Sequence, residues 1–166
     1  MKNTRYDKGF TIAELLTALA IAAILLAAVA VAFNASYKNY SENEKIFKTI
    51  NNARQALFRI TSQLRTAQAV EPNTPQNECT LITAGGQDLT YRYNSTDNKL
   101  YLITNDDLSD NDYLLCDNVT AMTFNKDTAF EGTPPYVKSV QISITVQQGD
   151  IQRTFPSAVV IRRNLN

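Results

Sequence analysis

The sequence predicts an α+β protein in which one long N-terminal helix packs against an antiparallel β-sheet. Helical signals run without Pro or Gly from about residue 10 to Val70, where Pro72 and Pro75 follow closely. From residue 79 onward, short apolar stretches alternate with polar residues and are separated by turn residues, as in β-strands. We therefore expect a helical half followed by a β-rich half, residues 71–166.

The first part of the helix is an apolar run from Phe10 to Phe33, whose only polar members are Thr11, Glu14 and Thr17. As a helix it would be about 36 Å long at 1.5 Å per residue. A hydrocarbon core is about 30 Å thick, so the run can cross a bilayer once. Basic residues precede it and favour a cytoplasmic N-terminus: they are Lys2, Arg5 and Lys8.

Glu14 distinguishes between three interpretations of this run. A secretory signal fits the basic start, but its apolar core is usually shorter. A plain membrane anchor leaves Glu14 unexplained, because a carboxylate in hydrocarbon costs on the order of 3 kcal/mol. The third interpretation is a cut between Gly9 and Phe10, which creates an α-amino group one turn from Glu14. In staggered helices that amine can pair with Glu14 of the next chain, so the carboxylate sets the register of assembly.

The stretch Lys8-Gly9-Phe10-Thr11-Ile12-Ala13-Glu14-Leu15-Leu16 resembles the processing signature of the type IV pilin and type II secretion pseudopilin superfamily. The resemblance implies that residues 1–9 are a leader peptide removed by prepilin peptidase, with N-methylation of Phe10. It also implies that residues 10–33 leave the membrane to pack among the helices of other pilins or pseudopilins, with Glu14 acting in assembly.

Residues 34–70 continue the helix as an amphipathic half. One apolar stripe recurs at spacings of four and three and predicts packing on the protein's own sheet, with a coiled-coil seam as the alternative: Ile46, Ile50, Ala53, Leu57, Ile60, Leu64 and Ala67. We expect Phe47 and Phe58 to widen this core face. Five basic residues and no acidic one lie between residues 45 and 70. They predict either a solvated surface or a contact with acidic surfaces of adjacent subunits.

The β-rich half is expected to form one antiparallel sheet. The predicted strands are residues 80–83, 89–93, 100–103, 113–116, 119–124, 137–146 and 151–161. The second and third should form a hairpin, and Pro156 should mark an edge strand or a bulge.

Two features favour a minor subunit. Leu114-Leu115 followed by Val119, Met122 and Phe124 resembles minor pseudopilins of the J type and related minor pilins. Major subunits usually carry a helix-loosening Pro or Gly in the middle of the membrane segment, where Ala23 and Val31 stand here.

Cys79 and Cys116 would lie outside the inner membrane, in an oxidising compartment. We predict a disulfide between them, worth roughly 4 kcal/mol in the chain-entropy model, with two free thiols as the alternative. The acidic stretch 105–112 is rich in oxygen ligands, but its spacing does not match an EF-hand loop. A solvated turn is predicted there, and a calcium site is the alternative.

Composition argues against catalysis. The chain has no histidine, no C-x-x-C pair, no phosphate loop and no G-x-S-x-G, so neither an enzyme nor a cofactor is predicted. Sixteen basic residues balance sixteen acidic ones, which indicates no nucleic-acid partner.

The predicted function is structural. The chain would be a single-pass inner-membrane precursor with its C-terminal domain outside, which becomes a minor (pseudo)pilin. By resemblance, it helps to initiate or cap a type IV filament in type II protein secretion. One alternative is a minor pilin of a type IV pilus that acts in adhesion or DNA uptake. The other is a periplasmic domain on a permanent anchor.

Overall fold

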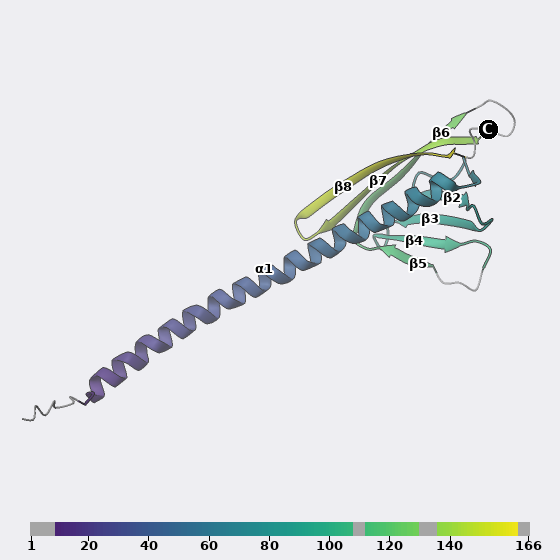
Figure 1. Cartoon of the computed structure of the whole chain (residues 1–166). Helices are drawn as coiled ribbons and strands as arrows, with labels where there is room; N and C mark the ends of the chain where they lie inside the picture. The colour runs from purple at the N-terminus through teal and green to yellow at the C-terminus, as the bar shows by residue number, and fades with distance from the viewer. Residues whose placement is uncertain (1–8, 108–111, 130–135, 163–166) are drawn as a thin grey trace, which may run out of the picture. The chain divides into compact units, whose positions relative to one another are not determined.

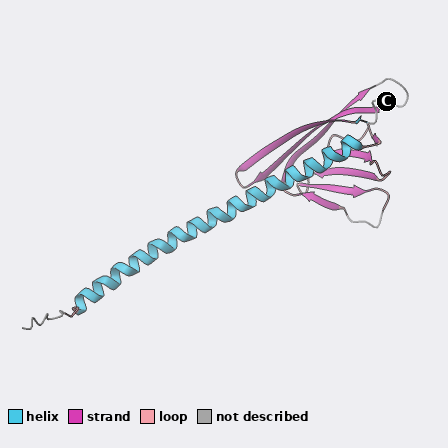
Figure 2. Cartoon of the chain, in the orientation of Figure 1, coloured by secondary structure: helices cyan, strands magenta, loops and turns pink. Residues whose placement is uncertain are grey.

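A computed structural model describes residues 9–107, 112–129 and 136–162 of the chain. It contains one long helix, α1 (Ile12–Thr66), followed by eight strands (Figure 1). Helix and strands occupy separate stretches of the sequence, which confirms the α+β class (Figure 2). The chain divides into two compact units, Met1–Asn43 and Glu44–Asn166, so α1 contributes to both.

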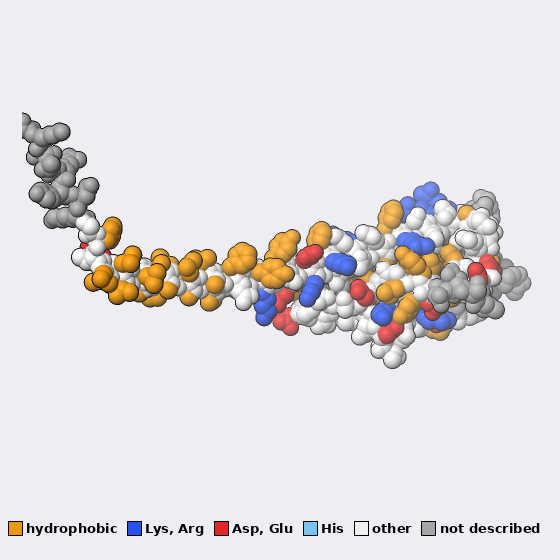
Figure 3. Space-filling model, turned by 90° about the horizontal axis from the view of Figure 1, so that it is seen from below, with side chains coloured by type: hydrophobic (Ala, Val, Ile, Leu, Met, Phe, Trp, Pro, Cys, Tyr) orange, Lys and Arg blue, Asp and Glu red, His pale blue; other side chains and the backbone are white. Residues whose placement is uncertain are grey.

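In the first unit the helix has no partner within the described residues, and all of its large apolar side chains are exposed. Alanine and leucine dominate its sequence, and both are strong helix formers. Among the described residues, α1 is the one helix that is long and apolar enough to cross a membrane. In Figure 3 hydrophobic side chains cover the early part of this helix.

In the second unit the strands form two antiparallel sheets. The strands of the first sheet lie in the order β1 to β5: β1 (Ala69–Val70), β2 (Glu78–Ile82), β3 (Asp88–Asn94), β4 (Lys99–Thr104) and β5 (Tyr113–Cys116). The second sheet holds β6 (Val119–Ala129), β7 (Tyr136–Gln148) and β8 (Ile151–Val160), in that order. The predicted hairpin is β3–β4, and Pro156 lies on the edge strand β8, so both predictions are confirmed.

The expectation of a single sheet is wrong. The chain leaves the first sheet at Asp117-Asn118, where Asn118 has a φ of 56°, a left-handed conformation that asparagine tolerates better than most residues. The Val119 backbone N–H then donates to the Asn98 carbonyl at 2.9 Å, and the Gln147 N–H donates to the Asn118 carbonyl at 2.9 Å. Residues near both sheets therefore hold this turn in place, and β6 starts the second sheet.

One hydrophobic core joins the C-terminal part of α1 to both sheets. Within the predicted stripe, Ala53, Ile60, Leu64 and Ala67 are buried, whereas Ile46, Ile50 and Leu57 are half-buried. This burial favours packing on the protein's own sheets over a coiled-coil seam. Thr49 and Ala56, which the stripe did not include, are also buried and widen the face.

Phe47 and Phe58 do not widen the core as expected, because they are 67% and 76% exposed. Phe58 stands two residues from both Ala56 and Ile60, which is about 200° around a helix of 3.6 residues per turn. Its side chain therefore lies opposite the buried face. The helix also ends at Thr66 rather than near Val70, because the Gln68 N–H donates to the Ile82 carbonyl at 2.8 Å and starts β1.

A half-buried lysine helps to tie the two sheets together. Lys126 on β6 donates through Nζ to the carbonyls of Thr74 at 2.8 Å and Glu78 at 3.1 Å, in the segment that leads into β2. Burial lowers the pKa of Lys126. The Phe124 N–H also donates to the Gln76 carbonyl at 2.7 Å. Sheet edges that would otherwise lack partners are thus joined through the 72–78 segment.

The predicted Cys79–Cys116 disulfide is absent, and both cysteines are free and buried. Cys79 on β2 pairs with Tyr91 on β3, Tyr91 pairs with Leu102 on β4, and Cys116 lies on β5 beyond it. Three strand spacings of about 4.8 Å separate the two cysteines, whereas a disulfide needs Cα atoms within about 7 Å. Burial instead raises the pKa of the Cys79 thiol to about 11 and that of Cys116 to about 12.

The acidic stretch 105–112 lies partly outside the described residues, since 108–111 are not described. In the part that is described, Asp106 Oδ2 accepts from the Asp88 N–H at 2.9 Å, and Asn105 Nδ2 donates to Asp88 Oδ1 at 2.8 Å. These contacts tie the turn that follows β4 to the first residue of the neighbouring strand β3. Across the described ranges no group of three metal-ligating side chains is present.

Candidate functional site

The first turn of α1 contains a reciprocal capping arrangement between Thr11 and Glu14. Glu14 Oε2 accepts from the Thr11 N–H and from Thr11 Oγ1, both at 2.9 Å. In return the Glu14 N–H donates to Thr11 Oγ1 at 3.2 Å. This is a capping box, in which the residue before the helix and the third helical residue satisfy each other's free backbone donors. The sequence T-x-x-E therefore starts the helix at Ile12.

This cap gives Glu14 a role that the sequence analysis did not assign. The carboxylate has polar partners in its own chain, but it has no cation, because Arg92–Glu78 is the one ion pair among the described residues. Only one of its two oxygens is used, and Oε1 has no hydrogen-bond partner in the described part of the chain. Glu14 can therefore keep its cap and still accept a donor from another chain.

Gly9 and Phe10 lie just before the helix and are fully exposed, with Phe10 at 87%. A Cβ atom added at Gly9 would meet nothing within 4 Å, and Gly9 is not among the glycines with positive φ. The fold itself therefore gives no steric reason for a glycine at this position. An exposed, non-helical peptide bond beside a small residue is accessible to a peptidase.

The helix that follows carries an apolar surface on all sides. Its exposed side chains include Ile12, Leu15, Leu16, Leu19, Ile21, Ile24, Leu25, Leu26, Val29, Val31 and Phe33. A helix that is hydrophobic all round belongs in a membrane or in a packed core. An exposed apolar surface that continues from Ile12 to Phe33 marks a contact with lipid or with other proteins.

The structure brings together only part of the predicted site. Gly9 and Phe10 directly precede the capped start of α1, and Glu14 lies in its first turn. Thr11 is the residue of this cap that the prediction missed. Its signal was present in the sequence as the capping pattern T-x-x-E before an apolar run. The stripe and the two cysteines belong to the core of the second unit instead.

Comparison with known proteins agrees with this geometry. A family model described as the prokaryotic N-terminal methylation motif matches residues 4–30, the segment that contains Gly9, Phe10 and Glu14. No curated protein and no solved structure matches the chain. The match therefore concerns the N-terminal segment and does not reach the β-rich half, residues 71–166, which we call the outer domain. The chain carries the N-terminal signature of type IV pilins and pseudopilins, which supports a processed, pilin-like subunit.

Proposed function

We propose that this chain is made as a membrane-inserted precursor, cut between Gly9 and Phe10, and then assembled through its apolar helix into a type IV filament. The observation that carries the proposal is a helix of exposed apolar side chains that starts with an accessible Gly9–Phe10 bond and a capped carboxylate. Within its own chain, this helix buries nothing up to Tyr40.

The two oxygens of Glu14 support the assembly step. Oε2 holds the cap on Thr11, and Oε1 faces no donor among the described residues. The new α-amine of a neighbouring Phe10 would supply that donor together with a compensating charge. An unpaired charge in an apolar core costs several kcal/mol, so helices that stack out of register would be penalised.

The finer part of the proposal is a minor subunit that helps to initiate or cap the filament, in type II secretion. An uninterrupted α1, without Pro or Gly from Ile12 to Thr66, supports it. The resemblance links a helix break in this region to major subunits.

The test is the N-terminus and intact mass of the mature protein isolated from membranes of the cell that makes it. We expect a chain that begins at Phe10 and carries one methyl group on its amine. The matched variant is Gly9→Leu, chosen because a Cβ atom added at this position meets nothing within 4 Å. It should retain residues 1–9. A wild-type chain that begins at any other residue contradicts the proposal and leaves a permanent anchor.

A further inference from the structure

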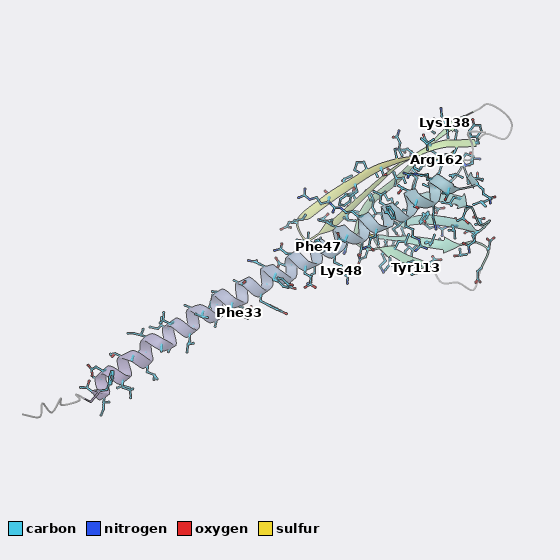
Figure 4. All side chains as sticks on the ribbon, in the orientation of Figure 1. Phe33, Phe47, Lys48, Tyr113, Lys138 and Arg162 are labelled. Atoms are coloured by element: carbon cyan, nitrogen blue, oxygen red, sulfur yellow. The ribbon has the colours of Figure 1, made fainter. Side chains whose placement is uncertain are left out.

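The outward face of α1 in the second unit carries two exposed aromatic rings. Phe47 and Phe58 are far more exposed than Ala53 and Ile60, which lie between and beside them on the same helix and are completely buried. Figure 4 places Phe47 on α1 next to Lys48. Large aromatic side chains that are exposed on a helix already packed on two sheets have no role in that packing.

Two arginines flank Phe58, and each is held over an aromatic ring. The Arg54 guanidinium lies 5.3 Å from the ring centre of Phe155 on β8, and the Arg59 guanidinium lies 5.7 Å from that of Tyr113 on β5. Each sheet thus supplies one ring that orients one arginine. Stacking on a ring leaves the edge of the Arg54 guanidinium, with its N–H donors, free to bind. The Arg59 guanidinium also lies near the Tyr91 hydroxyl, which takes up part of its donor capacity.

Neither arginine forms an ion pair within the described part of the chain. Between residues 45 and 70 the sequence holds five basic side chains and no acidic one. Among the described residues the one ion pair is Arg92–Glu78, which does not involve this face. Oriented arginines beside exposed aromatic rings are the residue types that dominate protein–protein binding energy.

We propose that this basic aromatic face, formed by Phe47, Arg54, Phe58, Arg59 and Tyr113, docks the acidic outer domain of a neighbouring pilin-like subunit. The inference rests on the proposed function, because it places the contact within a filament. Charge complementarity identifies the occupant. Residues 71–166 of this chain hold twelve acidic and seven basic side chains, so an outer domain of this build presents carboxylates to the basic helix of its neighbour. Carboxylates bind arginine through paired, charge-assisted hydrogen bonds.

A nucleic acid fits the surroundings of this face less well. The whole chain has no net charge, and the part beyond the helix is acidic. A polyanion lying along α1 would therefore meet repulsion from the rest of the domain.

The test is a photo-crosslinking amino acid at position 58 of the full-length chain, in membranes of the cell that makes it. We expect a covalent product with a pilin-like subunit that carries the N-terminal methylation motif and an acidic outer domain of the kind seen in this chain. The double reversal Arg54→Glu/Arg59→Glu should reduce this product about tenfold or more. The control is Lys138→Glu on β7, an exposed basic residue that lies away from Phe47 and Tyr113 (Figure 4) and should leave the product unchanged.

The inference is overturned by a product with nucleic acid or with lipid, or by a product that survives the double reversal. Thermal unfolding of each variant, expected to match the wild type, shows that the fold is intact. N-terminal sequencing of the same samples separates a failure of the docking face from a failure of the proposed function. Chains that begin at Phe10 but give no product refute only the docking face. Chains that keep residues 1–9 refute the proposed function and, with it, the docking face.

Discussion

The two parts of α1 share one secondary structure but differ in what completes them. Up to Tyr40 the described helix buries no side chain, whereas between Thr49 and Leu64 it buries five against the two sheets. Helix propensity is similar in both parts, since neither contains Pro or Gly. The difference lies in the pattern, which is apolar all round in the first part and one-sided in the second.

This difference shows which part of the molecule is complete by itself. The outer domain is complete in its hydrogen bonding, because no buried side-chain N or O atom of the described residues lacks a hydrogen-bond partner. In the apolar part the helix pairs the backbone N–H and C=O groups, but the exposed side chains need lipid or other subunits to cover them. Five measurements test this account.

The largest expected effect is on the stability of the outer domain. Ile60→Ala removes a completely buried side chain from the core and should lower the free energy of unfolding by about 2–5 kcal/mol. Phe58→Ala on the exposed side of the same helix should change it by less than about 0.5 kcal/mol. Denaturant unfolding of the full chain in detergent, followed by tyrosine fluorescence, measures both.

A matched change in the apolar part completes this test. Leu19→Ala removes a similar side chain that is 68% exposed, and it should leave the unfolding of the outer domain unchanged. If Leu19→Ala destabilises the outer domain as much as Ile60→Ala does, the two parts are not independent and the contrast fails.

The next effect concerns the lysine hydrogen bonds that tie the two sheets together. Lys126→Met removes the ammonium group that donates to the carbonyls of Thr74 and Glu78. Since the carbonyls then lose a charged donor, stability should fall by about 1–3 kcal/mol. Lys138→Met, on the same sheet but exposed, is the control and should be nearly neutral. Equal effects at the two positions would show that the Lys126 contacts add nothing.

A smaller effect should appear at alkaline pH. The pKa of Cys79 is about 11 and that of Cys116 about 12 in the folded chain, against about 8.5 when exposed. Above pH 8.5 the unfolded chain therefore releases thiol protons that the folded chain keeps, so stability falls as the pH rises toward 11–12. In the Cys79→Ala/Cys116→Ala variant this slope should be shallower. The comparison of slopes matters here, because the cavities lower the absolute stability at every pH.

Reagent access checks the same burial independently. A thiol alkylating reagent should modify neither cysteine in the native chain and both after unfolding, and the mass of the untreated chain should not change on reduction. Rapid native alkylation, or a mass change on reduction, would contradict the separation of β2 from β5.

Local sequence patterns were sufficient to predict much of the fold. Periodicity located α1 and seven of the eight strands, because hydrophobic spacing reports directly which face of an element is buried. The motif around Gly9 and Glu14 could also be recognised from the sequence, because its residues are adjacent, and the family model matches the segment that contains them. Cleavage after Gly9 stays a prediction. Thr11 was overlooked although its capping pattern is equally local.

What sequence analysis missed depends on contacts between distant residues. Strand order, which no local period encodes, determines three of these features. They are the pairing of β1 with Ile82, the second sheet and the separation of Cys79 from Cys116. Phe58 was misplaced because an apolar residue beside a stripe was assumed to extend it. Its angular position on the helix, opposite Ile60, would have corrected this.

The most direct test of the contrast between the two parts is Glu14→Gln. Glutamine can preserve the capping box with Thr11 but removes the charge, so the helix and the outer domain should remain intact. We predict that this chain unfolds like the wild type yet falls about tenfold or more in the sheared filament fraction, because the neighbour's amine loses its counter-ion. Wild-type amounts of Glu14→Gln in filaments would contradict the account, since the carboxylate would then be only a helix cap.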